Sequence, residues 1–327
     1  MAYTIAFFGT KPYDESSFND KNKEFGFEIR YYKGHLNKNN VLLTQGVDAV
    51  CIFVNDVADA EVIRIMAENG VKLLALRCAG FNNVDLNAAA TAGITVVRVP
   101  AYSPYAVAEY TVALMLSLNR KIPRASWRTK DGNFSLHGLM GFDMHGKTAG
   151  IIGTGKIAKI LIHILKGFGM NVPDYNFARE EQIVYTSLDE LYHSSDIISL
   201  HCPLTEETKY LINDYSISKM KDGVMIINTG RGQLIHTNAL IEGLKNKKIG
   251  SAGLDVYEEE SEYFYEDQSD RIIDDDVLAR LLSFNNVIVT SHQAFFTREA
   301  MENIAMTTLQ NIKDFINHKP LLNEVKR

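Results

Sequence analysis

Three residues with complementary acid–base chemistry follow separate apolar runs in the last part of the chain. Arg231 follows the run 224–228, Glu260 follows the run 251–254 and His292 follows the run 287–290. An arginine can bind a carboxylate through two hydrogen bonds and polarise an adjacent carbonyl, whereas a histidine titrates near neutral pH and can donate or accept a proton. A carboxylate bonded to the second ring nitrogen would fix the histidine tautomer and favour its charged form. With a nicotinamide hydride donor, these groups are a complete set for reducing a 2-oxo acid.

Taken singly, each of the three is more often an ordinary loop or salt-bridge residue. Glu260 ends a run of three glutamates, which could equally be a solvated edge. Their shared context favours a site, because open α/β sheets bind ligands just beyond the carboxyl ends of their strands.

A glycine pattern indicates where a nicotinamide dinucleotide would bind. A short apolar run from Thr148 leads into Gly153-x-Gly155-x-x-Ala158, and an apolar helical pattern follows at once. Gly153 permits the tight turn, Gly155 lets backbone approach a pyrophosphate, and Ala158 lets helix and strand pack closely. The exposed N–H groups of the helix N-terminus favour phosphate. The pattern also fits a plain strand–turn–helix, so it depends on the residues described above.

The rest of the chain alternates apolar runs with segments of helical spacing, which predicts a parallel α/β architecture. Strands are expected at 4–8, 27–31, 49–54, 73–76, 95–99, 197–200, 224–228, 251–254 and 287–290, with long helices over 106–121 and 298–317. Because 327 residues exceed one typical core, we expect two doubly wound parallel-sheet domains. Residues 1–101 with 297–327 would form a substrate domain, and 102–296 a dinucleotide-binding domain.

Composition narrows the partners. The chain is 46% apolar and 23% charged with a net charge of −6, which argues against nucleic acid because no concentrated basic face is present. Cys51, Cys78 and Cys202 are far apart and lack metal-ligand spacing, so we expect neither a metal site nor a disulfide framework. No apolar run is long enough to cross a bilayer, and the N-terminus lacks a basic start. These features predict a cytoplasmic protein without membrane or nucleic-acid partners.

Longer motifs give a resemblance to a known family. They are the stretches 77–85, 99–104, 133–138, 153–158, 200–204, 228–232, 255–260 and 291–295. Over nearly its whole length the chain resembles the D-2-hydroxyacid dehydrogenases, and within them the NAD-dependent D-lactate dehydrogenases of bacterial fermentation. The resemblance implies a Rossmann-type cofactor domain and a flavodoxin-like substrate domain around a cleft, assembled as a homodimer or homotetramer.

The resemblance also implies roles for particular residues. Arg231 would orient the keto acid, His292 would be the general acid in reduction, and Glu260 would partner the histidine. Backbone N–H groups of Ala79 and Gly80 would hold the substrate carboxylate, Tyr102 would contact the substrate, and Phe53 and Phe296 would bound its side chain. A tight turn alone would also explain Ala79 and Gly80, and the three aromatics could be ordinary core residues.

The same resemblance implies an NAD site. Its residues would be Gly153, Gly155, Lys156 and Ile157 at the phosphate turn, Asn176 at the ribose, Cys202 and Pro203 along the adenosine, Thr229 and Gly230, and Asp255 at the nicotinamide carboxamide. Asn176 stands where the family usually has an aspartate, and an amide does not repel a 2′-phosphate. Arg179 lies near enough to be a possible partner of that phosphate, whereas Asp174 could take the place of the missing acid after a local register shift. The sequence therefore leaves open the choice between NADH and NADPH.

We therefore predict NADH-dependent, reversible reduction of pyruvate to D-lactate. One alternative is a related dehydrogenase for a bulkier 2-oxo acid such as phenylpyruvate, 2-oxoisocaproate or hydroxypyruvate. Another is a non-enzymatic, NAD-sensing protein similar to the corepressors of the same superfamily, which the intact Arg231, Glu260 and His292 do not exclude.

Overall fold

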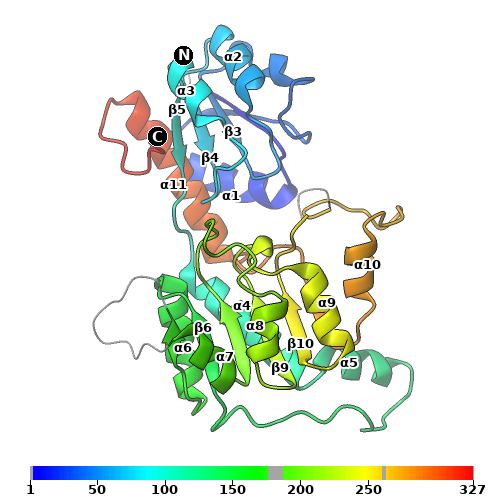
Figure 1. Ribbon diagram of the computed structural model, residues 1–327. Coiled ribbons are helices and arrows are strands. Elements are labelled where there is room, and N and C mark those ends of the chain that lie inside the picture. Colours follow the sequence, from blue (N-terminus) through cyan, green and yellow to red (C-terminus); the bar gives the residue numbers. More distant parts are fainter. Residues whose placement is uncertain (1–2, 176–186, 260–262, 327) are drawn as a thin grey trace. The chain divides into compact units, whose positions relative to one another are not determined.

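The computed structural model describes residues 3–175, 187–259 and 263–326. The chain divides into two compact units, one formed by Met1–Ser103 with Phe296–Arg327 and the other by Pro104–Phe295. Each unit is built on a parallel sheet (Figure 1), which confirms the predicted α/β class. Among the described residues, no helix combines the length and apolarity that crossing a membrane requires.

The first unit contains a five-stranded sheet in the order β2-β1-β3-β4-β5. Its strands are β1 (Thr4–Phe7), β2 (Glu28–Tyr31), β3 (Ala49–Ile52), β4 (Leu73–Leu76) and β5 (Thr95–Arg98). This is the flavodoxin-like order, in which the chain reverses its direction of travel across the sheet between β1 and β3. The central strands β1, β3 and β4 are buried along their whole length, so their sequences are continuous apolar runs rather than alternating ones.

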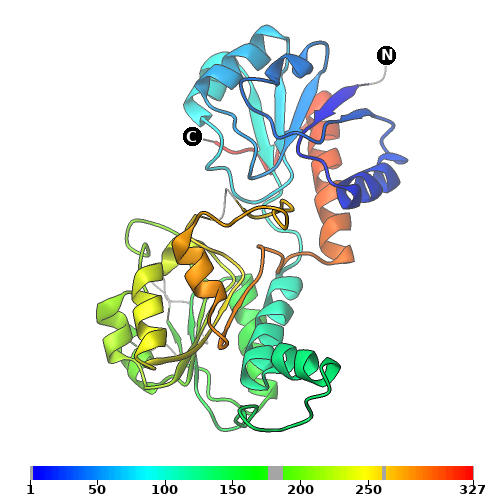
Figure 2. The same cartoon turned by 90° about the vertical axis from the view of Figure 1, so that its right-hand side faces the viewer.

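Helices cover both faces of this sheet. The helices α1 (Pro12–Asn22) and α11 (Arg298–Ile316) lie together on one face, and α2 (Ala60–Glu68) and α3 (Leu86–Ala92) lie on the other, preceded by the short turn η1 (Val41–Thr44) (Figure 2). The helices α2 and α3 each have an aspartate as N-cap. The side chain of Asp59 accepts from the N–H of Val62, and that of Asp85 accepts from the N–H of Ala88. Each cap satisfies a backbone donor that the first helical turn leaves unpaired.

The second unit contains a six-stranded sheet in the order β11-β10-β9-β8-β6-β7. Its strands are β6 (Ala149–Ile152), β7 (Asp174–Tyr175), β8 (Ile197–Leu200), β9 (Val224–Asn228), β10 (Ile249–Leu254) and β11 (Val287–Val289). The helices α4 (Pro104–Asn119) and α6 (Lys156–Gly167) pack on one face; α7 (Leu188–Ser194), α8 (Asp214–Lys219), α9 (Thr237–Lys245) and α10 (Asp276–Leu282) pack on the other. Beyond β6 the chain builds β7 on one side and β8 on the other, which makes the carboxyl end of β6 the switch point where such sheets bind ligands.

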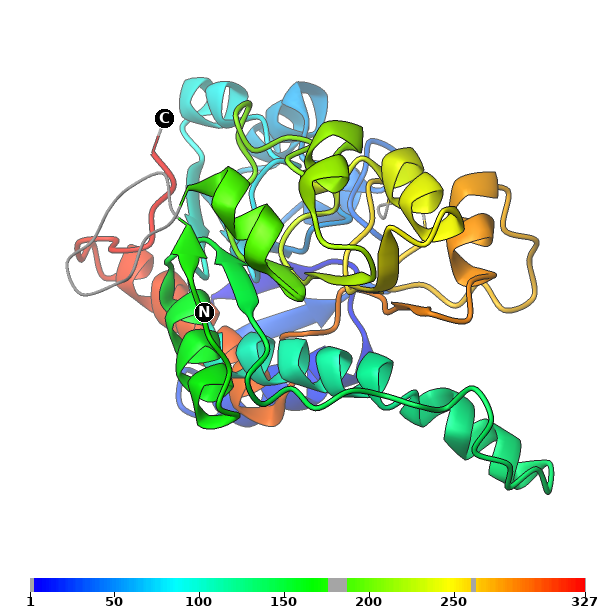
Figure 3. The same cartoon turned by 60° about the horizontal axis from the view of Figure 1, so that its bottom comes forward.

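Helix α5 (Ile122–Lys130) follows α4 and buries none of its residues. Together with the chain that follows it, this helix extends away from the rest of its unit (Figure 3), and the chain returns to α4 where Asn119 bonds both backbone polar groups of Phe142. The predicted helices 106–121 and 298–317 are present as α4 and α11 with small shifts at their ends.

Candidate active site

The predicted glycine turn joins β6 to α6. Gly153 has a φ of +118°, and a Cβ built on it would lie 2.6 Å from the carbonyl oxygen of His201 and 2.9 Å from the nitrogen of Cys202, so only glycine fits there. Gly155 is the N-cap of α6, and a Cβ added to it would meet nothing within 4 Å. Ala158 is fully buried against the sheet. An open helix N-terminus behind a forced glycine turn fits the pyrophosphate of a dinucleotide, with the backbone at Lys156 and Ile157 presented to it.

The adenosine side is described only in part. Asn176, at the predicted ribose position, and Arg179 lie outside the described residues. Cys202 is buried beside the glycine turn, and the preceding His201 places its Nε2 2.8 Å from the hydroxyl oxygen of Ser199. Burial lowers the pKa of His201 to about 4, so the ring is neutral at pH 7 and adds no positive charge behind the phosphate turn.

Strand register aligns the chemistry at one edge of the second sheet. Asn228 at the end of β9 pairs with Leu254 at the end of β10, and Leu254 pairs with Val289 at the end of β11. Arg231 and His292 each follow three residues beyond these strand ends. Because all three strands are parallel, both side chains leave the same edge of the sheet, the edge that carries the glycine turn. The structure therefore places the predicted arginine and histidine at the same edge of the sheet as the glycine turn.

The Arg231 turn is fixed by its own strand. The Asn228 side chain donates to the carbonyl of Arg231 (2.9 Å) and accepts from the N–H of Gly230 (3.0 Å). Thr229 is buried and its hydroxyl lies 3.0 Å from that of Thr111 in α4. The guanidinium itself is on an exposed residue, with Nη1 donating to the carbonyl of Gly230 (2.8 Å). A rigid backbone thus presents a solvent-accessible fork, as carboxylate binding requires.

Gly232 brings this turn against the segment that leads to Glu260. A Cβ added to Gly232 would collide with the carbonyl of Tyr257 and the nitrogen of Glu258. Residues 260–262 lie outside the described residues, so the position of Glu260 beside His292 stays a prediction. The backbone contact nevertheless brings the described start of that segment, Tyr257 and Glu258, directly against the Arg231 turn.

Asp255 organises the histidine turn. It is fully buried, and its carboxylate accepts from the hydroxyl of Thr290 (2.6 Å) and from the N–H groups of Gln293 (2.9 Å) and Ala294 (2.8 Å). Its carbonyl accepts from the N–H of His292 (2.7 Å). Burial raises the pKa of the Asp255 carboxyl, against the lowering effect of these hydrogen bonds. The sequence pointed only to the nicotinamide carboxamide for Asp255; that contact stays a prediction beside this role in holding residues 290–294.

Tyr265 is a contributor that the sequence did not reveal. Its hydroxyl donates to the carbonyl of His292 (3.1 Å), and the two rings lie 5.9 Å apart. His292 has a φ of +52° and Tyr265 a φ of +71°, a region that non-glycine residues seldom adopt. Tyr265 lies in the acidic stretch 255–276, and the aromatic residues of that stretch are the sequence signal that could have pointed to it. In the structure this loop holds the backbone of the predicted general acid.

The loop after β4 in the first unit has two backbone donors to offer. The carbonyl of Ala79 accepts from Arg98 Nη1 (2.8 Å), and the carbonyl of Gly80 accepts from the thiol of Cys78 (3.3 Å). Within the described ranges, neither the N–H of Ala79 nor that of Gly80 donates to another protein group. Both residues are half-buried. The loop therefore offers two adjacent N–H groups that bind no other protein group in these ranges, while its carbonyls already accept hydrogen bonds. A carboxylate could accept from both N–H groups.

The predicted pocket aromatics also belong to the first unit. Phe53 follows β3 and is half-buried, Tyr102 is anchored by its carbonyl, which accepts from Asn303 Nδ2 (2.8 Å), and Phe296 is 47% exposed. The ring of Phe296 meets that of Tyr13 edge to face at 4.8 Å between centroids. Their contact with a substrate side chain stays a prediction.

Known proteins resemble the chain over its whole length. Residues 112–294 match the family model described as D-isomer specific 2-hydroxyacid dehydrogenase, NAD binding domain. Over 313 residues the chain is 52% identical to a 2-hydroxyacid dehydrogenase homolog of Haemophilus influenzae, covering 94% of this chain and 95% of that protein. It is 50% identical over 326 residues to the D-lactate dehydrogenase of Escherichia coli, covering 98% and 99%. The solved pyruvate reductase of Chlamydomonas reinhardtii matches the fold with a TM-score of 0.94 at 44% identity, over 98% of each chain.

Proposed function

The chain belongs to the D-isomer specific 2-hydroxyacid dehydrogenase family, and on that premise we propose that it reduces pyruvate to D-lactate with NADH and catalyses the reverse oxidation. The observation that carries the proposal is the placement of Arg231 and His292 on the sheet edge that bears the dinucleotide turn. Similarity to a D-lactate dehydrogenase and to a pyruvate reductase over nearly the whole chain supports the choice of substrate.

The proposed mechanism assigns one task to each group. NADH, when bound, supplies a hydride to C2 of the keto acid. His292 gives its proton to the carbonyl oxygen as that oxygen gains charge, so the product is the neutral hydroxyl and a neutral imidazole remains. Arg231 binds the carboxylate and stabilises the charge developing on the carbonyl oxygen, an effect that for a single positioned donor is typically about 3 kcal/mol.

Further residues would prepare the site for this transfer. The N–H groups of Ala79 and Gly80 hold the substrate carboxylate, and Glu260 accepts a hydrogen bond from the second ring nitrogen of His292, which fixes the orientation of the ring. Tyr265 and Asp255 fix the backbone of the histidine turn. Because His201 is neutral, the N–H groups at the N-terminus of α6 would bind the phosphates of the cofactor without help from a charged histidine.

A kinetic panel tests the substrate and the cofactor together. We expect NADH oxidation with pyruvate at a kcat/KM above that for phenylpyruvate, 2-oxoisocaproate and hydroxypyruvate, and product that a D-specific assay detects. A preference for phenylpyruvate would overturn the pyruvate assignment. Asn176→Asp should raise the preference for NADH over NADPH if residue 176 faces the ribose.

The proposal includes a homo-oligomer in the cytoplasm, where the three buried free cysteines would stay reduced. Large apolar side chains stand exposed on α5 and the segment after it, among them Trp127 at 69% and Met140 at 87%, and such clusters commonly mark protein interfaces. Light scattering on the purified protein should give the molar mass of a dimer or tetramer. Trp127→Glu should shift the molar mass toward that of the monomer, because it places a charge in the proposed interface. A wild-type monomer would contradict this part of the proposal.

A further inference from the structure

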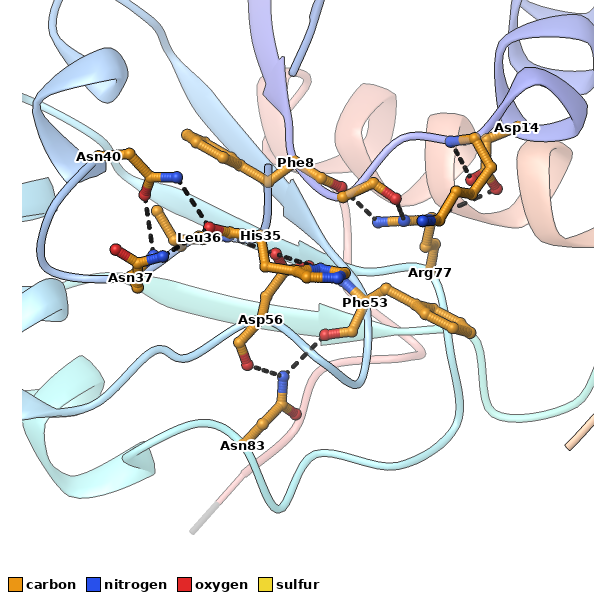
Figure 4. Close-up of polar contacts among 12 residues, drawn as sticks. Phe8, Asp14, His35, Leu36, Asn37, Asn40, Phe53, Asp56, Arg77 and Asn83 are labelled. Carbon is orange, nitrogen blue, oxygen red and sulfur yellow. Dashed lines mark hydrogen bonds and ion pairs between the residues drawn. The ribbon is translucent and has the colours of Figure 1, made fainter. Parts of the chain in front are cut away.

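We propose that Asn83 and Arg77 are positioning residues that lock the aromatic wall Phe53 to the carboxylate-binding loop and thereby set the size of 2-oxo acid that the enzyme accepts. The inference rests on the proposed function, because it concerns the selectivity of that reaction. It is carried by a partly buried network of hydrogen bonds at the carboxyl ends of β1, β3 and β4 in the first unit (Figure 4).

Asn83 ties the turn after β3 to the loop after β4. Its Nδ2 donates to the carbonyl of Phe53 (2.8 Å) and to the carbonyl of Asp56 (2.8 Å), as Figure 4 shows. Its own carbonyl accepts from the N–H of Ala58 (3.0 Å). One side-chain amide therefore uses its donors to hold the main chain on which Phe53 stands.

Asp56 binds the other backbone polar group of Phe53, its N–H. This carboxylate is fully buried and accepts from the N–H of Phe53 (2.5 Å) and from the N–H of Leu36 (2.6 Å). Leu36 lies in a loop that is itself braced, because the side chains of Asn37 and Asn40 both donate to the carbonyl of His35. Both backbone polar groups of Phe53 are thus bound to side chains, which leaves its backbone little freedom.

Arg77 fixes the Phe53 ring. Its guanidinium carbon lies 4.9 Å from the centroid of Phe53 and 4.4 Å from that of Phe7, an arrangement that favours cation–π attraction. The same guanidinium donates to the carbonyls of Phe8 (3.0 Å) and Gly9 (2.9 Å) and lies 3.6 Å from Asp14. Since Arg77 is buried and cannot reorient without losing these contacts, its guanidinium restrains the position of the Phe53 ring.

The two residues bracket the loop that would bind the substrate. Arg77 and Asn83 stand on either side of Ala79 and Gly80, whose N–H groups are unspent within the described ranges. The carboxylate end of a substrate and the wall facing its side chain are therefore fixed to one another. A 2-oxo acid longer than pyruvate must displace Phe53, and the lock resists that displacement.

The test compares Asn83→Ala with Asn82→Ala, an exposed neighbour in the same motif. Losing two amide hydrogen bonds should lower the ratio of kcat/KM for pyruvate to that for 2-oxobutyrate by about tenfold, mainly through a lower KM for 2-oxobutyrate, with kcat for each substrate within about twofold of wild type. The matched control should keep the wild-type ratio. An unchanged ratio in folded Asn83→Ala, or an equal change in Asn82→Ala, would overturn the proposal. Asn83→Ser, which keeps one shorter donor, carries the same test if the alanine variant does not fold.

A double-mutant cycle shows whether Asn83 acts through Phe53. Phe53→Ala should itself lower the ratio, and adding Asn83→Ala should then change it no further, since the wall is already gone. Fully additive effects would refute the lock. If Phe53→Ala leaves the ratio unchanged while pyruvate is still reduced, this inference fails and the proposed function stands; a wild-type protein inactive on pyruvate refutes the proposed function instead.

Discussion

Removing a single oxygen at Tyr265 tests how the predicted general acid is held. Tyr265→Phe keeps the ring 5.9 Å from that of His292 and deletes only the hydroxyl that donates to the His292 carbonyl. A left-handed conformation costs a non-glycine residue about 1–2 kcal/mol, and His292 holds a φ of +52°. It therefore depends on contacts such as this hydrogen bond and the one from its N–H to Asp255.

The magnitude follows from the bond that is lost. One neutral hydrogen bond contributes about 0.5–1.5 kcal/mol, which corresponds to a reduction in kcat of roughly 2- to 12-fold if it is expressed entirely in the barrier. We expect kcat to fall within this range while the Kd for NADH stays within a factor of about two, because the phosphate turn lies on β6 and is untouched.

Steady-state kinetics over pH 5–9, with NADH binding followed by fluorescence, measures both quantities. Tyr263→Phe is the matched control, since it removes a tyrosine hydroxyl two residues away without touching His292. A kcat and pH profile for Tyr265→Phe that equal those of wild type would refute the reasoning. An equal loss in Tyr263→Phe would mean that the loop as a whole, rather than this hydrogen bond, is responsible.

Four further outcomes are expected. His292→Gln should lose most turnover and still bind NADH in a fluorescence titration, whereas an unchanged kcat removes His292 from the mechanism. Arg231→Lys should raise KM for pyruvate and lower kcat, because a point charge cannot replace the guanidinium fork; wild-type kinetics would exclude that role. Gly153→Ala should weaken NADH binding and lower Tm, since its Cβ would lie 2.6 Å from the His201 carbonyl, and retained affinity would count against the phosphate turn. Burial lowers the pKa of His201 from 6.5 to about 4, so between these pH values the unfolded chain binds a proton that the folded protein does not. The free energy of unfolding, measured by urea denaturation, should therefore fall from about pH 6.5 toward pH 4 by at most about 3 kcal/mol. His201→Gln should remove this pH dependence.

The sequence predicted the elements whose signals are local. The strands β1, β3 and β4 read as unbroken apolar runs because each is buried on both faces, and the glycine turn was visible because its steric demand falls on the residues that encode it. Arg231 and His292 could be placed on one edge because parallel strands align their carboxyl ends, which the observed register confirms.

Contacts between segments that are distant in the chain could not be predicted from the sequence. Tyr265 is separated from His292 by 27 residues and Asn83 from Phe53 by 30, and nothing in either local pattern identifies the partner. Asp255 is more instructive, because the resemblance assigned it to the cofactor while its carboxylate binds the turn that carries His292. A role that depends on donors from residues 290–294 exists only once β10 and β11 lie side by side.

For Ala79 and Gly80 the sequence allows two interpretations, a carboxylate-binding loop and a plain tight turn. A tight turn alone would satisfy the small residues by closing their backbone groups on one another. Instead, Arg98 and Cys78 take up the two carbonyls, and within the described ranges the two N–H groups stay unspent. Two adjacent N–H groups that bind no other protein group in these ranges are available to a carboxylate, which is what the role proposed for Ala79 and Gly80 requires.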